Sequence, residues 1–150
     1  MSYESAWIGT EVSTEFRLYS REHGGFACGD GAEFKCFGEE GKNARRPDAS
    51  YIRPGRLEAP PRGPCEVVPD VVVEVLSPGD RIFDHDEKLR AYRAAEVPVV
   101  IVLNPLTRTA DVRRGEEVTR LPEDGVLELP EEMPGFRLEL SKVWPPAAGG

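Results

Sequence analysis

The sequence has few cysteines, no long apolar run and no internal repeat, and each of these absences argues against a class of protein. Three cysteines, Cys28, Cys36 and Cys65, are odd in number and lack C-x-x-C spacing, which argues against a disulfide framework or a zinc knuckle. The longest apolar run, Val97–Leu103, is far shorter than the ~20 residues of a membrane-spanning helix. No basic and apolar leader is visible at the start. We therefore expect a soluble protein of the cytoplasm, with no membrane partner.

The length of the chain and its net charge further limit the number of domains and the kinds of partner to expect. A chain of 150 residues matches one ordinary domain, which we place at residues 1–144, with 145–150 as a disordered tail. The net charge of −8 argues against indiscriminate nucleic-acid binding. The range 41–62 is an exception, because six basic residues stand there against two acidic ones. A run of like charges is most often a solvent-exposed face, so this one indicates a functional surface only if catalytic residues lie beside it.

Hydrophobic periodicity predicts a helix, then strands, then a strand–helix–strand unit. Ile8, Val12, Phe16 and Tyr19 recur at helical spacing over residues 3–22. The β-branched run 71–76 reads as a central strand covered on both faces. A helix over about 84–95, capped by Asp80 or Asp84, would connect it to a parallel strand at 97–103. The remaining predicted elements are short strands at 26–28, 33–37 and 49–53, a loop at 57–66, a hairpin at 109–114 and 117–121, and a last short element ending at Trp144.

Glu74 interrupts the central valine-rich strand. Burying an unpaired charge costs several kcal/mol, so Glu74 must be paired, protonated or bound to a metal. If residues 48–53 and 70–76 pair antiparallel, Asp48 lies beside Glu74 or Leu76, and Asp70 lies at the opposite end of the strand. Two carboxylates meeting from different strands form a credible Mg²⁺ site, whereas we interpret Asp70 as a loop-capping residue.

The helix after this strand carries a second candidate group. Asp84, Lys88 and Tyr92 are spaced four residues apart and share one face. This face is either an ion pair plus a packed tyrosine, or the side of the helix that turns toward Glu74. In the second case Lys88 would stand beside a metal-bound water and assist the reaction.

Several motifs resemble the Uma2 family of the PD-(D/E)XK nuclease superfamily. They are RPDASYI at 46–52, PDVVVEVLSP at 69–78, Lys88-x-x-x-Tyr92, VVIVLNP at 99–105 and MPGF at 133–136. The resemblance implies a three-layer α/β/α restriction-endonuclease-like fold around a mixed sheet. It also implies Mg²⁺ (or Mn²⁺) held by Asp48, Glu74 and the carbonyl of Val75, with Lys88 catalytic and Asp84, Tyr92 and Ser77 as secondary candidates.

Two departures from the family pattern keep an alternative open. The superfamily motif carries lysine two residues after the acid, where this chain has Leu76, so the lysine would come from the helix as Lys88. Family members usually carry a further hairpin with a glutamate before the first helix, so we expect this chain to be N-terminally short. The leading hypothesis is a Mg²⁺-dependent endonuclease that hydrolyses DNA as a homodimer; the alternative is an inactive relic or interaction domain. A nucleotide-binding enzyme is disfavoured, because no glycine-rich loop follows a strand.

Overall fold

A long N-terminal helix opens the computed structural model, which describes residues 2–37 and 44–147. Helix α1 spans Tyr3–His23 and is capped by Ser2, whose hydroxyl accepts a hydrogen bond from the Ser5 amide at 3.0 Å. It ends at Gly24, whose positive φ of 85° suits glycine. Its apolar stripe of Ile8, Val12, Phe16 and Tyr19 is buried, as the periodicity predicts.

Six strands form the main sheet, in the order β1-β2-β3-β4-β5-β6. The pair β3–β4 is parallel and the other pairs are antiparallel, so the sheet is mixed. The predicted parallel pair and the predicted hairpin β5–β6 are confirmed. The strands are β1 (Phe26–Gly29), β2 (Ala49–Ile52), β3 (Val71–Val75), β4 (Val99–Asn104), β5 (Thr109–Arg114) and β6 (Glu117–Leu121).

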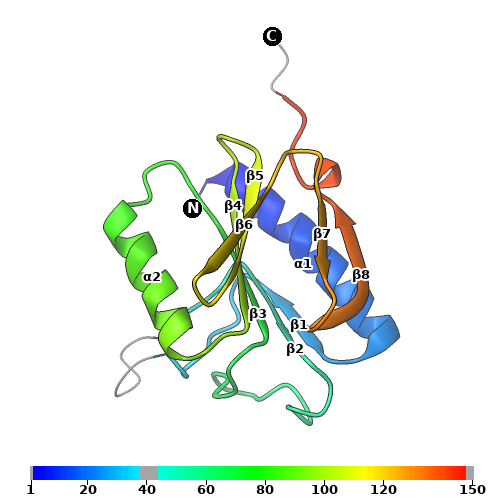
Figure 1. The fold of residues 1–150 in the computed structure, drawn as a ribbon. Helices are drawn as coiled ribbons and strands as arrows, with labels where there is room; N and C mark the ends of the chain where they lie inside the picture. The colour runs from blue at the N-terminus through cyan, green and yellow to red at the C-terminus, as the bar shows by residue number, and fades with distance from the viewer. Residues whose placement is uncertain (1, 38–43, 148–150) are drawn as a thin grey trace.

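Helices cover both faces of this sheet (Figure 1). Val71, Val73 and Val75 pack on the α1 side, together with a second small sheet of β7 (Val126–Leu129) and β8 (Met133–Glu139). Val72 packs on the other side against Tyr92 of α2 (Ile82–Ala94). A strand buried on both faces explains why valines fill β3 apart from Glu74, and the three-layer α/β/α arrangement is confirmed.

Some local predictions were wrong. Residues 33–37 form no strand, and only Phe34 makes isolated bridges, to Arg45 and Cys65. Helix α2 is preceded by Arg81 without a side-chain cap, because the Asp80 carboxylate instead accepts the Ser77 amide at 2.8 Å. Strand β7 was not predicted, since one short strand with a partly exposed start leaves little periodic signal.

The end of the chain follows a short 3-10 helix at Leu140–Lys142. Residues 145–147 have no regular structure, and the Pro145 carbonyl accepts a hydrogen bond from Arg108 at 2.8 Å. The rest of the expected tail, residues 148–150, lies outside the described residues. In the ranges that the structure covers, no helix is long and apolar enough to cross a membrane.

Candidate functional site

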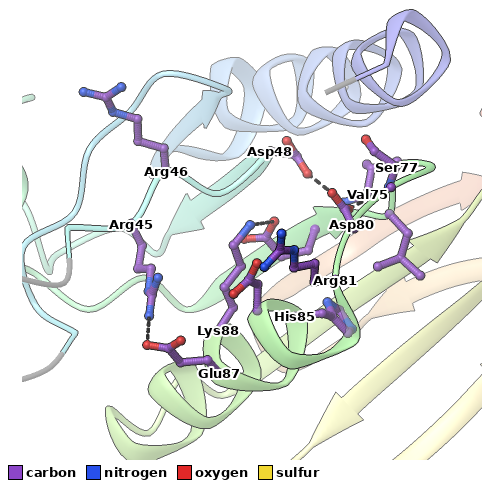
Figure 2. Close-up of a pocket in the computed structure, with 14 residues that line it drawn as sticks. Arg45, Arg46, Asp48, Val75, Ser77, Asp80, Arg81, His85, Glu87 and Lys88 are labelled. Carbon is purple, nitrogen blue, oxygen red and sulfur yellow. Dashed lines mark hydrogen bonds and ion pairs between the residues drawn. The ribbon is translucent and has the colours of Figure 1, made fainter.

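A cleft of about 530 Å³ opens where β2 begins, β3 ends and the first turns of α2 pass. Figure 2 shows its lining, which combines carboxylates with basic side chains. The chain brings them together because β2 and β3 are antiparallel, so the start of one strand meets the end of the other. The residues that line the cleft are Arg45, Arg46, Asp48, Glu74, Val75, Leu76, Ser77, Gly79, Asp80, Arg81, Asp84, His85, Glu87 and Lys88.

Asp48 is held rigidly at the start of β2. Its amide donates to the Val73 carbonyl at 3.0 Å, and its Oδ2 accepts the Val75 amide at 2.7 Å. Helix α1 passes directly over it at Gly9, where a Cβ would lie 3.6 Å from the Asp48 Cβ. Burial raises the pKa of Asp48, and the Val75 amide opposes that rise.

Glu74 lies beside it on β3 and faces α2. The register pairs Ala49 with Val73, so Asp48 stands opposite Glu74, and the predicted strand register is confirmed. The Tyr92 hydroxyl donates a short hydrogen bond to Oε1 of Glu74, and the Lys88 Nζ lies 4.0 Å from Oε2. Burial raises the pKa of Glu74 to about 7; the Asp48 charge adds to the rise, whereas Tyr92 and Lys88 oppose it.

Asp70 lies at the opposite end of β3 from Glu74 and binds residues of the loop that follows β2. It is almost fully buried, and its Oδ2 accepts the Arg53 amide at 2.9 Å and the Arg56 Nη1 at 2.8 Å. Arg53 Nε also lies 3.1 Å from Oδ1. These contacts agree with the interpretation of Asp70 as a loop-capping residue rather than a member of the cleft.

The predicted face of α2 turns toward the carboxylates. Tyr92 is fully buried against Glu74, while Lys88 is 44% exposed and Asp84 lines the cleft mouth. Ser77 closes the turn after β3, since its amide donates to Asp80 and its Oγ accepts the Ser2 amide at 3.4 Å. The structure thus brings Asp48, Glu74, Val75, Lys88, Asp84, Tyr92 and Ser77 together; their functional roles stay predictions.

The donor set suits a hard cation with few protein ligands. The part of the chain that the structure describes holds no group of three His, Cys, Asp or Glu side chains able to bind a metal. Asp48 and Glu74 are nevertheless two adjacent oxygen donors, with Val75 beside them in the cleft lining. Mg²⁺ typically binds proteins through one or two carboxylates and keeps several waters, so this pair fits it.

Three basic residues of the cleft were not singled out from the sequence. Arg45 lies within the basic range and its guanidinium stands 3.8 Å from Glu87. Arg81 immediately precedes α2 and His85 lies in its first turn, and burial lowers the pKa of His85. The sequence signal for Arg45 was its place three residues before Asp48; nothing in the pattern separated it from the neighbouring arginines.

Comparisons with known proteins agree with this architecture. The model of the family described as "Uma2: Putative restriction endonuclease" matches residues 1–141. A crystal structure described as "a putative nuclease belonging to DUF820" from Anabaena variabilis is similar, with a TM-score of 0.79 and 16% identity. The match covers 96% of this chain and 82% of that one, and at this identity it shows a shared fold. No curated protein matches the chain.

Proposed function

Because the chain belongs to the Uma2 family, we propose that it is a Mg²⁺- or Mn²⁺-dependent endonuclease that hydrolyses phosphodiester bonds of DNA. The observation that carries this proposal is the pair of buried carboxylates, Asp48 and Glu74, meeting from adjacent strands at the floor of a cleft. Tyr92 and the Val75 amide each donate a hydrogen bond to the pair, but the neighbours of Glu74 along β3 are valines, whose packing does not depend on a carboxylate. The pair therefore supports a role in chemistry rather than in stability.

Asp48, Glu74 and the Val75 carbonyl would hold the metal. The chemistry that such an ion would supply is polarisation of a phosphoryl oxygen and a lower pKa of a bound water molecule. Burial raises the pKa of both carboxylates, and the Asp48 charge adds to the rise at Glu74; a divalent cation held by the pair would offset both effects. Tyr92 orients Glu74 through its hydrogen bond. Lys88 would place a cation beside the charge that develops on the phosphate.

Basic side chains around the cleft support a polyanionic substrate. Lys88, Arg45 and Arg81 line the cleft beside its carboxylates, so positive charge is available there in a protein of net charge −8. The attraction to DNA is local, so it should weaken with salt, and the net charge of −8 should limit binding elsewhere on the surface. We place the protein in the cytoplasm and propose a homodimer, in which two sites could address two strands.

Plasmid cleavage and metal calorimetry test the proposal together. We expect cleavage with Mg²⁺ or Mn²⁺ that disappears with EDTA. Glu74→Gln should lose both metal binding and cleavage, because an amide keeps the shape but not the charge. Lys88→Ala should reduce turnover at least tenfold with nearly unchanged metal affinity, since a cation is not a ligand; equal turnover would remove Lys88 from the mechanism.

A non-catalytic interaction domain is the second candidate. The observation that favours it is that residues 2–37 and 44–147 contain no group of three His, Cys, Asp or Glu side chains placed to hold one metal ion. No cleavage across salt conditions, together with no metal binding by calorimetry, would decide for this alternative.

A further inference from the structure

Arg45 is largely buried and, among the described residues, has no carboxylate within hydrogen-bond distance. Its side chain is only 17% exposed. Its Nε is buried and has no hydrogen-bond partner among the described residues. The carboxylate of Glu87, the nearest one in the described ranges, lies 3.8 Å away, beyond hydrogen-bond distance, and is itself 56% exposed. A half-buried guanidinium in this state is poorly compensated and favours an anion as its partner.

The backbone of Arg45 is held by hydrogen bonds, which fixes the point from which its side chain extends. The Phe34 amide donates to the Arg45 carbonyl at 2.8 Å, and the Arg45 amide donates back to the Phe34 carbonyl at 3.0 Å. Pro47 follows, and Asp48 is anchored to β3. The Arg45 backbone is therefore held between the bridge to Phe34 and the start of β2, where Asp48 is anchored.

The orientation of the Arg45 side chain distinguishes it from its neighbour Arg46. Arg45 and Arg46 both line the cleft and a smaller cavity of about 350 Å³ that Glu74, Lys88 and Tyr92 also line. Figure 2 shows Arg45 pointing toward Glu87 on α2, whereas Arg46 points away. Arg46 is 64% exposed and already hydrogen-bonded to Glu33 at 2.9 Å.

We infer that Arg45 is the residue that clamps a backbone phosphate of the nucleic-acid substrate next to the Asp48–Glu74 pair. This inference rests on the proposed nuclease function and adds a substrate-positioning residue to it. A planar guanidinium can offer two parallel N–H donors to one phosphate, which fixes the orientation of the phosphate as well as its presence. Glu87 is then a counter-charge that the substrate phosphate displaces.

Binding measured apart from cleavage tests the inference. A fluorescein-labelled DNA duplex is titrated in Ca²⁺ buffer, with gels confirming that it stays intact, over a series of salt concentrations. We expect Arg45→Gln to weaken binding about 10- to 100-fold, as for loss of a charged hydrogen-bonded contact. It should also reduce the slope of log K against log salt by about 0.9, the value for one phosphate contact. The affinity of Arg45→Lys should lie between those of the wild type and Arg45→Gln, because lysine keeps the positive charge but lacks the two parallel N–H donors of a guanidinium.

Two comparators and two outcomes make the result decisive. Arg137→Gln removes the same charge from a 60% exposed position on β8, and should leave affinity and slope unchanged; Arg46→Gln should have a smaller effect than Arg45→Gln. An Arg45→Gln protein that melts normally and binds like Arg137→Gln overturns the inference alone. Weaker binding with an unchanged salt slope also overturns it, because a merely structural role would act that way.

The same data separate this inference from the proposed function. DNA binding that depends on Arg45, without cleavage in Mg²⁺ or Mn²⁺, supports the clamp and contradicts the nuclease. A wild-type protein that binds no DNA overturns both.

Discussion

At the scale of single residues, the raised pKa of Glu74 makes the free energy of unfolding depend on pH. Its pKa is about 7 in the folded protein against an ordinary 4.5, so between these pH values the folded state binds more protons than the unfolded state. Stability should therefore fall as pH rises from about 4.5 to about 7 and stay lower above. In metal-free buffer, Glu74→Gln should unfold with a free energy higher than wild type by up to about 3 kcal/mol at pH 8, and nearly equal at pH 4.

Urea unfolding at both pH values measures this difference. Glu128→Gln is the control, since that carboxylate is 57% exposed and pairs with Arg137 on the surface. Equal stability of wild type and Glu74→Gln at pH 8 would mean that Glu74 is not a strained buried acid.

Asp48 and Asp70 are both buried, but substituting asparagine for each should have opposite effects on activity and stability. Asp48→Asn removes a proposed metal ligand, so we expect activity to vanish while the fold persists. Asp70→Asn removes the charge that pairs with Arg53 and Arg56, so we expect about 1–3 kcal/mol lower stability with most activity retained at low temperature. Unfolding curves and initial cleavage rates of the two variants provide the check, and the reverse pattern would exchange their roles.

At the scale of elements, α1 determines how closely the helix layer approaches the site. Gly9 is buried over Asp48, and an added Cβ would lie in ordinary contact distance, 3.6 Å from the Asp48 Cβ. Gly9→Ala should therefore raise stability by about 0.5–1 kcal/mol through helix propensity, with activity kept. Gly9→Leu should displace Asp48 and lose metal affinity, whereas Thr10→Leu on the exposed side should not; thermal melting and calorimetry measure both effects.

At the scale of the whole molecule, the sheet leaves β6 as an outer strand. Four of its five residues are exposed, including Val118 at 46%, and an exposed edge strand is a template for pairing with another chain. We expect sedimentation at micromolar concentration to show a dimer. Val118→Lys should shift the protein toward monomer, because a lysine on an edge opposes pairing; a wild-type monomer would contradict the proposed dimer.

Much of the fold and the position of the carboxylate pair could be predicted from local patterns. The helical stripe of α1 and the valine run of β3 predicted burial, because a period of 3.6 or a continuous β-branched run has few other structural solutions. Glu74 stood out because a carboxylate in such a run needs a partner. The antiparallel register that sets Asp48 opposite it followed from the two flanking strands and the intervening proline-rich loop.

Tertiary packing decided the features that local pattern does not encode. The N-terminus of α2 differs from the prediction because Asp80 accepts a hydrogen bond from the Ser77 amide across a turn. Arg81, which makes no side-chain cap, therefore precedes the helix. The elevated pKa of Glu74 comes from burial between β3 and α2, and the weak compensation of Arg45 comes from its distance to Glu87. Thus the sequence by itself determined which residue types could do chemistry and on which strands they lie. Which of them are desolvated, paired or left with free donors depends on distances across elements, and only the folded chain sets those distances.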